Sequence, residues 1–261
     1  MRIAIVGGAG TLGRHITLEL AERGHDVRVL SRSSPQYPID LVSGRGLAAA
    51  LAGCAVVVDA SNASAPRRAA QVLVAGSLQL LAAGERAGAT HHVGISIVGC
   101  ERIPVGYYRV KTEQEQVIER GPMPWSIVRA TQFHELADMA LTAAGKWRVL
   151  PIPAMRLQTV AAAEVARVVA DVAEGEPGRG RGRIQVAGPQ VTTAAELVRT
   201  WKSITGRRAL SVPVPVPGKL GRELRAGALT APQADVMGSQ TFADWLSARV
   251  AAGGMRPGQS A

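Results

Sequence analysis

Hydrophobic positions in the first half of the chain form short β-branched runs that alternate with longer segments of helical spacing. Residues 2–6 form such a run and end in glycines, and residues 11–24 then place apolar side chains at helical spacing. Later runs predict strands over 26–32, 55–61 and 91–99, a strand that runs out into a loop over 125–136, and a long helix over 71–88. This alternation predicts an α/β fold with a doubly wound parallel sheet and right-handed crossovers.

The alternation becomes less regular after about residue 150. A helix is predicted over 159–175, a strand over 183–188 and a helix over 192–206, and a proline-rich run follows over 211–218. We therefore divide the chain into a core over residues 1–150, a small C-terminal portion packed on it over 151–252, and a flexible tail over 253–261.

Length and composition fit a globular protein. A chain of 261 residues with 47% apolar content can bury a large core. Its longest apolar run, residues 47–58, is shorter than the roughly 18 residues that a membrane-spanning helix needs. The first residues break into glycine too early for the apolar stretch of about 7 to 15 residues in a secretory signal. We expect a cytoplasmic protein with no membrane partner.

The net charge of +10 would suit a polyanionic partner. Most basic residues are arginines, however, and they are spread over the whole chain without a run that is interleaved with aromatic residues. Residues 175–183 ("GEPGRGRGR") look like a basic patch, but we interpret them as a solvated loop. We expect no nucleic-acid partner, since charge alone favours solubility and nonspecific attraction.

Neither a disulfide nor a metal site is predicted. Cys54 and Cys100 stand alone, without a CxxC pair, and are interpreted as free thiols. His91 and His92 are neighbours in a predicted strand, so they point to opposite faces and cannot chelate one ion together.

A glycine-rich turn joins the first strand to the first helix. Gly7, Gly10 and Gly13 have the GxxGxxG spacing, which allows a tight turn, close approach of the backbone to a pyrophosphate, and close packing of helix on strand. Thr11 and Leu12 complete this turn. Because the motif follows a strand and opens a helix, it predicts dinucleotide binding on a Rossmann-type fold.

The residues after the second strand indicate which dinucleotide is bound. An NAD site usually offers an acidic residue there, whereas this chain reads Ser31, Arg32, Ser33. Arg32 can pair with a 2′-phosphate, so NADP(H) is the expected cofactor. Arg14, just after the third glycine, is either a second cation for this phosphate or an ordinary solvated helix residue.

Together these residues resemble a known family. The chain is similar to atypical short-chain dehydrogenases/reductases of the NmrA-like group, which includes both reductases and catalytically silent NADP-binding regulators. The likeness spans nearly the whole chain. It rests on the glycine turn, "IDL" (39–41), "DASNAS" (59–64), "GISIVG" (94–99), "YYRVK" (107–111), "RATQFHEL" (129–136) and "TFADWL" (241–246).

The resemblance implies roles for individual residues. Asp40 would accept a hydrogen bond from the adenine amine, with Leu41 beside the ring, and Ser96 would be the catalytic serine at the end of its strand. His134 is either a substrate contact or an ordinary histidine at a helix start. The remaining cofactor positions implied are Ala60, Ser61 and Asn62 in the loop of the family's fourth strand, and Thr131 and Phe133 beside the nicotinamide, with Phe133 also facing substrate.

Lys111 lies four positions after Tyr107, so on a helix the two residues share one face. Tyr108 points elsewhere. A phenol near its usual pKa of about 10 exchanges protons poorly at neutral pH, and we expect the lysine ammonium to lower the pKa of Tyr107. The resemblance implies that Lys111 also holds the nicotinamide ribose. The alternative is an ordinary helix start.

Three functions are compatible with this pattern. The first is an NADPH-dependent reductase of a small carbonyl, quinone or conjugated ketone, in which Ser96, Tyr107 and Lys111 assist hydride transfer. The second is an NADP(H)-binding redox sensor or regulator without turnover. The third is a non-redox enzyme on the same fold, such as an epimerase, dehydratase or cyclase. The resemblance implies that the C-terminal portion binds the substrate, and the aromatic content of 3% favours an aliphatic pocket.

Overall fold

The computed structural model describes residues 1–63, 66–103, 105–175 and 182–253. The tail predicted over 253–261, apart from Gly253, and most of the loop predicted over 175–183 lie outside these residues. The backbone divides into two compact units. Unit 1 comprises Met1–Arg129 and Ala163–Ile184, and unit 2 comprises Ala130–Ala162 and the chain from Gln185 onward. The chain leaves unit 1 after Arg129 and returns to it at Ala163 for a helix and the first residues of a strand.

A seven-stranded sheet forms the centre of the fold. Its order is β11-β8-β5-β4-β3-β1-β2, so β1 has β2 on one side and β3 on the other. Both of these pairings are parallel, with Ile3 opposite Val27 and Val56. The predicted α/β doubly wound fold is therefore confirmed. The strands are β1 (Arg2–Val6), β2 (Asp26–Leu30), β3 (Val56–Asp59), β4 (His91–Ile97), β5 (Trp125–Ala130), β8 (Gly182–Ala187) and β11 (Val236–Met237).

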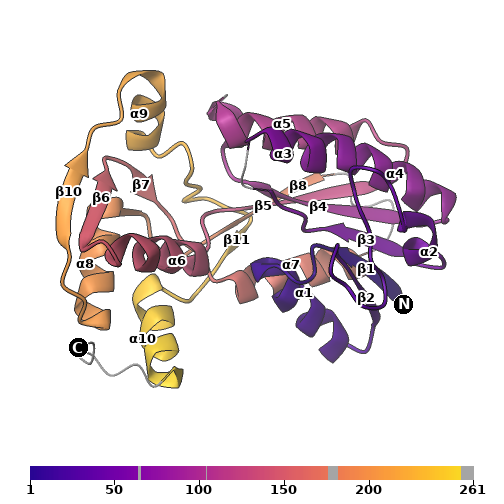
Figure 1. Cartoon of the computed structure of the whole chain (residues 1–261), viewed down its shortest axis with the longest axis horizontal. Coiled ribbons are helices and arrows are strands. Elements are labelled where there is room, and N and C mark those ends of the chain that lie inside the picture. The colour runs from indigo at the N-terminus through magenta and orange to yellow at the C-terminus, as the bar shows by residue number, and fades with distance from the viewer. Residues whose placement is uncertain (64–65, 104, 176–181, 254–261) are drawn as a thin grey trace. The chain divides into compact units, whose positions relative to one another are not determined.

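Helices cover both faces of the sheet in unit 1, with α3, α4 and α5 on one face and α1 and α7 on the other (Figure 1). β3 is buried along its whole length, as expected for a parallel strand between two helical layers. The helical elements are α1 (Thr11–Glu22), α2 (Leu47–Leu51), α3 (Pro66–Ala69), the π-helical turn η1 (Ala70–Ala75), α4 (Gly76–Arg86), the 3₁₀ turn η2 (Cys100–Arg102), α5 (Gly106–Glu119) and α7 (Ala162–Glu174).

Ion pairs join the end of α1 to the end of α7 within unit 1. The Arg23 guanidinium lies 2.7 Å from carboxylate oxygens of both Asp171 and Glu174. His25 Nε2 lies 2.7 Å from the other oxygen of Glu174. These contacts connect the returning helix to the first βα unit, which accounts for its place in unit 1.

Unit 2 packs its helices around Trp201, Leu150 and Leu246, which are fully buried. Its β6 and β10 form a parallel pair, and its β7 and β9 an antiparallel pair. The start of the proline-rich run is strand β10, where Pro213 is tolerated because β6 is the strand's one neighbour among the described residues. The elements are α6 (His134–Gly145), β6 (Val149–Pro153), β7 (Arg156–Leu157), β9 (Thr192–Thr193), α8 (Ala194–Thr205), β10 (Leu210–Val214), α9 (Gly218–Arg225) and α10 (Phe242–Ala252).

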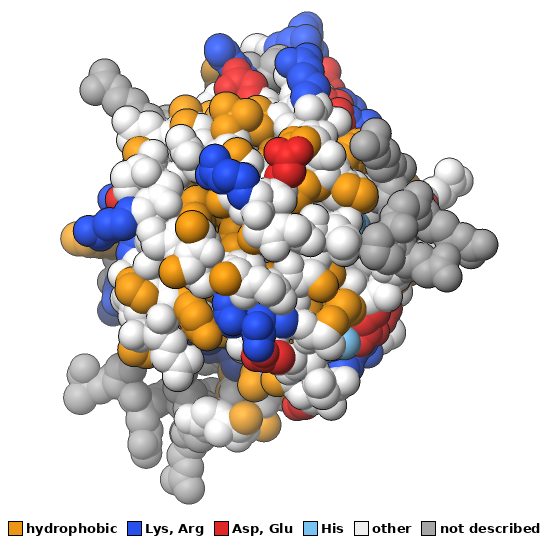
Figure 2. Space-filling view, turned by 90° about the vertical axis from the view of Figure 1, so that its right-hand side faces the viewer, with side chains coloured by type: hydrophobic (Ala, Val, Ile, Leu, Met, Phe, Trp, Pro, Cys, Tyr) orange, Lys and Arg blue, Asp and Glu red, His pale blue; other side chains and the backbone are white. Residues whose placement is uncertain are grey.

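The surface carries its positive charge in several small groups on the face that Figure 2 shows. Lys and Arg side chains stand there between hydrophobic and acidic ones. Over the residues that the structure describes, no helix has the length and apolar content to cross a membrane.

We expect acid to destabilise the protein through His92 on β4. Its ring is fully buried, and neither nitrogen has a hydrogen-bond partner among the described residues. Burial lowers the pKa of His92 to about 4, although Asp59 partly opposes this effect. The unfolded chain therefore binds this proton at a higher pH than the folded chain. Stability from His92 is complete above about pH 6.5 and is lost progressively as the pH falls toward the folded value.

The full loss is about 3 kcal/mol in the free energy of unfolding. Urea unfolding of wild type and His92→Leu at neutral pH and at about pH 5 measures the part of it, about 2 kcal/mol, that is lost by pH 5. The leucine needs no polar partner, so the variant should lose less stability on acidification than wild type. An equal loss in both proteins would contradict the assignment.

Candidate functional site

A cavity of about 620 Å³ lies at the carboxyl ends of β1, β2 and β3 in unit 1. The sheet order reverses between β1 and β3, and open α/β sheets bind ligands at such a point. Most of the cofactor residues predicted in this part of the chain line the cavity: Gly7, Gly10, Arg32, Asp40, Leu41, Ala60, Ser61 and Asn62.

The glycine turn shapes one wall of this cavity. Gly7 has φ +74°, and a Cβ there would lie 2.6 Å from the carbonyl oxygen of Ala60. A Cβ at Gly13 would overlap the backbone of Gly7, so this glycine allows α1 to pack against the turn. Gly10 donates its N–H to the Gly7 carbonyl at 2.9 Å and lines the cavity itself. A Cβ would thus meet different groups at each of the three glycines.

The start of α1 fits a pyrophosphate. Gly10 is the N-cap, and no side chain caps the helix there. The first N–H groups of α1 are therefore available to an anion at the positive end of the helix dipole. Thr11, Leu12 and Gly13 form this first turn and do not line the cavity. The residues present therefore suit a dinucleotide, with Gly10 and the start of α1 at the pyrophosphate.

The adenosine side of the cavity contains Arg32 and Asp40. Arg32 is exposed and lies two residues after the end of β2. Asp40 Oδ1 accepts a hydrogen bond from the Val42 N–H at 2.9 Å, and this bond holds the pKa of the carboxyl below its usual value. An ionised carboxylate can accept a further bond from a ligand amine. Leu41 is buried and adds an apolar surface beside it.

Sequence reasoning missed the contribution of the helix that starts at Pro66. Arg68, Gln71 and Val72 line the cavity, and the latter two lie in the π-helical turn η1. Arg68 is a second cation at the site, whereas Arg14 does not line it. The pair "RR" was visible in the sequence, but no sequence pattern predicts the π-helical turn that follows it. Such turns often accompany functional sites.

Tyr107 reaches the cavity wall through Asn62. Its hydroxyl donates a hydrogen bond to Asn62 Oδ1 at 2.8 Å, and its ring packs edge-on against Tyr108. Burial raises the pKa of Tyr107 well above its usual value, and Tyr108 and Asp59 add to this effect. The expectation that Lys111 lowers the pKa of this phenol is therefore wrong for this structure.

Lys111 is buried and held by other groups. Its Nζ donates to the Ile95 carbonyl at 2.9 Å and to Gln114 Oε1 at 2.8 Å. Burial lowers the pKa of the ammonium, and Asp59 opposes this. The network continues from Gln114 Nε2 to Asp59 Oδ2 at 3.2 Å, and Asp59 Oδ1 accepts the Ser61 N–H at 3.0 Å. A continuous polar chain thus connects the lysine to the cavity-lining loop.

Ser96 lies near the end of β4 and is buried. Its Oγ is 3.9 Å from Cys100 Sγ, and that thiol is 3.7 Å from Glu115 Oε1. Among the described residues, no hydrogen bond joins Ser96 to Tyr107 or Lys111. Of the three expected catalytic residues, Tyr107 and Lys111 therefore lie on α5 and Ser96 lies on β4. Each of them contacts different groups.

The other predicted residues belong to unit 2. Thr131 donates its N–H to Val186 O at 3.0 Å, and Phe133 forms an isolated bridge with Val160. His134 is fully buried, with Nε2 3.0 Å from Gln240 O and its ring against the rings of Phe242 and Trp245, which also contact each other. This burial favours the interpretation of His134 as a structural histidine over that of a substrate contact.

Both cysteines, Cys54 and Cys100, are buried free thiols. In the ranges for which positions are described, no group of three or more His, Cys, Asp or Glu side chains could hold a metal ion.

The sequence profile of the NAD(P)H-binding family matches residues 7–176, which is more than half of the chain. The chain belongs to the NAD(P)H-binding family. The resemblance to atypical short-chain dehydrogenases/reductases of the NmrA-like group is thereby confirmed, as is the expected class of cofactor, NAD(P)H.

Known proteins similar to this member of the NAD(P)H-binding family differ in activity. The photosystem II assembly factor Ycf39 of Synechocystis sp. is 28% identical over 238 residues, which cover 83% of this chain and 71% of that protein. The NADPH-dependent quinone oxidoreductase QOR2 of Escherichia coli, solved with NADPH, has a TM-score of 0.77 at 17% identity over 95% of this chain and 99% of that one. A nucleoside-diphosphate-sugar epimerase from Staphylococcus aureus has the same TM-score and identity over 95% of this chain and 100% of that one. At this identity the solved structures support the fold alone.

Proposed function

We propose that the protein is an NADPH-dependent reductase of a carbonyl, quinone or conjugated ketone substrate. The hydrogen bond from Tyr107 to Asn62 carries the proposal, since Asn62 also lines the cofactor cavity. A proton donor is thereby held beside the place that the cofactor would occupy. The quinone oxidoreductase with a similar fold binds NADPH, which supports this choice of chemistry.

In this proposal, NADPH held in the cavity by Gly10, Arg32 and Asn62 would supply the hydride that the electrophilic carbon of the substrate accepts. Negative charge then develops on the substrate oxygen, and the Tyr107 hydroxyl gives that oxygen its proton. Burial raises the pKa of the phenol, so the hydroxyl keeps its proton until this charge appears. Asn62 holds the hydroxyl at the cavity wall, and the hydroxyl would turn from Asn62 Oδ1 to the substrate oxygen to give up its one proton. Ser96 would donate a second hydrogen bond to the oxygen, and solvent would return a proton to Tyr107.

Lys111 has a positioning role in this arrangement. Its bonds to Ile95 O and Gln114 fix α5 against β4, and the chain through Asp59 fixes the loop of Ser61 and Asn62. The lysine would reach the nicotinamide ribose only by exchanging one of these partners.

Oxidation of NADPH in the presence of ketones, quinones and enones tests the proposal. Turnover of at least one compound, measured by the loss of the reduced nicotinamide, is the expected result. NADPH binding without turnover across all three classes would favour a second function. Conversion of a sugar nucleotide without net NADPH consumption would favour an epimerase.

The second function is an NADP(H)-binding regulatory or assembly protein without turnover. The raised pKa of Tyr107 and the engagement of Lys111 by Gln114 favour it, because neither group is activated in this structure. The likeness to an assembly factor for photosystem II points the same way. Such a protein would bind NADPH and a protein partner, and Tyr107→Phe would leave both interactions unchanged.

We expect Arg32→Asp to shift cofactor preference from NADPH toward NADH. The change removes a cation for the 2′-phosphate and adds an acceptor for a free ribose hydroxyl. Loss of a charge-assisted bond worth about 1.5–3 kcal/mol predicts an NADPH affinity lower by about tenfold to a hundredfold. Fluorescence titration with both cofactors measures the change.

The matched control is Arg14→Asp, which makes the same charge change in α1 outside the cavity. It should alter both affinities little. An equal loss of NADPH and NADH binding in Arg32→Asp would show that this arginine is structural.

A further inference from the structure

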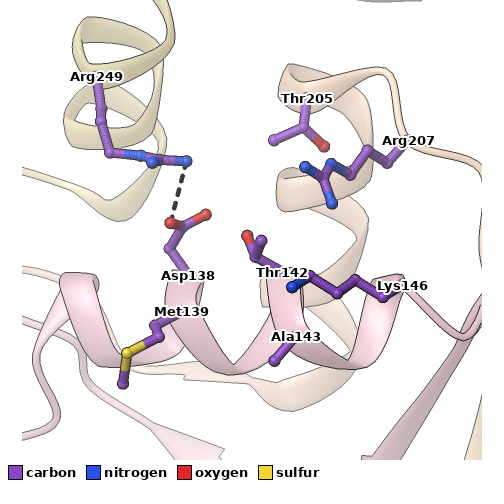
Figure 3. Close-up of a pocket in the computed structure, with 8 residues that line it drawn as sticks. All are labelled: Asp138, Met139, Thr142, Ala143, Lys146, Thr205, Arg207 and Arg249. Atoms are coloured by element: carbon purple, nitrogen blue, oxygen red, sulfur yellow. Dashed lines mark ion pairs between the residues drawn. The ribbon is translucent and has the colours of Figure 1, made fainter. Parts of the chain in front are cut away.

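A second cavity, of about 390 Å³, lies within unit 2 and shares no lining residue with the first. Helices α6, α8 and α10 bring its walls together, because their other faces pack on the core around Trp201. The polar side chains that line it are Asp138, Thr142, Lys146, Thr205, Arg207 and Arg249 (Figure 3).

The charges in this cavity do not balance. Asp138 is committed to two partners, with Oδ2 at 3.0 Å from Arg249 Nη2 and Oδ1 accepting from Trp201 Nε1 at 2.8 Å. Arg249 is thereby neutralised. Among the described residues, neither Lys146 nor Arg207 forms an ion pair. Two positive charges therefore face the cavity without a counter-charge.

The unpaired groups are arranged toward one space. Figure 3 shows the guanidinium of Arg207, the end of Lys146 and the hydroxyl of Thr142 turned toward the middle of the cavity. The Arg207 Cζ lies 5.7 Å from the centroid of the buried Trp201 ring, which limits the freedom of the guanidinium. Thr205 gives its proton to Trp201 O at 2.6 Å, so Thr142 is the better hydroxyl donor.

We propose that this cavity binds the phosphoryl group of a small molecule. A planar guanidinium can donate two parallel hydrogen bonds to phosphate oxygens, an ammonium adds a point charge, and a hydroxyl adds a third kind of donor. The volume lies in the range of about 300–1,000 Å³ typical of small-molecule sites, which leaves room for an organic group beyond the phosphate. Met139, largely exposed, and Ala143 supply an apolar wall for that group.

A structural explanation for the two cations competes with this proposal. Lys146 follows the end of α6 and Arg207 follows the end of α8, and a cation near a helix C-terminus offsets the helix dipole. That role requires neither a shared cavity nor a hydroxyl aimed into it. Ligand binding separates the two explanations.

The test is calorimetric titration of the full chain with inorganic phosphate and with phenyl phosphate, at saturating NADPH so that the first cavity is filled. Both should bind, and phenyl phosphate more tightly. Lys146→Met and Arg207→Gln should each weaken binding at least tenfold, by loss of a charge-assisted bond. Arg208→Gln, which removes the neighbouring charge outside the cavity, should bind like wild type.

Near-ultraviolet circular dichroism and NADPH titration establish that each variant is folded. If neither phosphate nor phenyl phosphate at millimolar concentration gave a heat of binding, the proposal would be overturned and the helix-dipole role would remain. If Arg208→Gln weakened phosphate binding equally, the binding would be nonspecific attraction to positive charge, and the proposal would be overturned. Binding to vesicles that contain phosphatidic acid, without binding of free phenyl phosphate, would replace the small molecule with a lipid headgroup.

Discussion

Replacing Tyr107 with phenylalanine should reduce turnover by about 100-fold or more and leave NADPH affinity nearly unchanged. The variant keeps the ring that packs against Tyr108 but loses the hydroxyl, which is bonded to Asn62 at 2.8 Å. Without the hydroxyl, no acid at this position can protonate the substrate oxygen as negative charge develops on it. Steady-state kinetics on any accepted substrate, with fluorescence titration of NADPH, measures both effects.

Tyr108→Phe is the matched control. It removes the same group from the next residue of α5, which is rotated by about 100° around the helix axis. Turnover should stay within a few-fold of wild type. Near wild-type turnover in Tyr107→Phe, or a larger loss in Tyr108→Phe, would contradict the assignment of the proton donor and favour the regulatory function.

The cofactor half of the site could be predicted from the sequence because its signals are local. The glycine spacing places three residues in one turn, and Arg32 and Asp40 lie close after a single strand. Parallel strands bring the ends of β1, β2 and β3 to one edge, so residues of separate loops meet in one cavity. The spacing of apolar residues identifies the strands, and the glycines identify the first turn. Together they indicate the edge of the sheet at which the cavity lies.

Other features depend on contacts between distant residues and could not be predicted in this way. Tyr107 and Lys111 do share α5, but burial of the phenol raises its pKa, and Gln114 takes the ammonium. Arg68 reaches the cavity because a π-helical turn follows it. His134 is buried by rings more than 100 positions later in the chain. Spacing on one element indicates which residues can meet, whereas burial and competing partners decide their protonation.

Changing Gly10 to valine should abolish detectable NADPH binding and leave the protein folded. The backbone of Gly10 has φ −75° and ψ 175°, an extended conformation that suits a β-branched residue. A Cβ there would lie 3.2 Å from Gly7 O, which small shifts can relieve, while the rest of the side chain would fill the space through which the backbone approaches a pyrophosphate. Cofactor titration and thermal unfolding together measure the two expectations.

Gly13→Val provides the contrast, because the two glycines differ in what a side chain would meet. At Gly13 a Cβ would overlap the backbone of Gly7 and lie 2.7 Å from Gly8 Cα, so α1 would have to move away from the turn. This variant should lower the thermal stability strongly and lose NADPH binding as a consequence. Gly10→Val should instead unfold close to the wild-type temperature. If folded Gly10→Val bound NADPH as wild type does, the cofactor would not approach this turn, and the site drawn from Gly7, Gly10 and the start of α1 would be wrong.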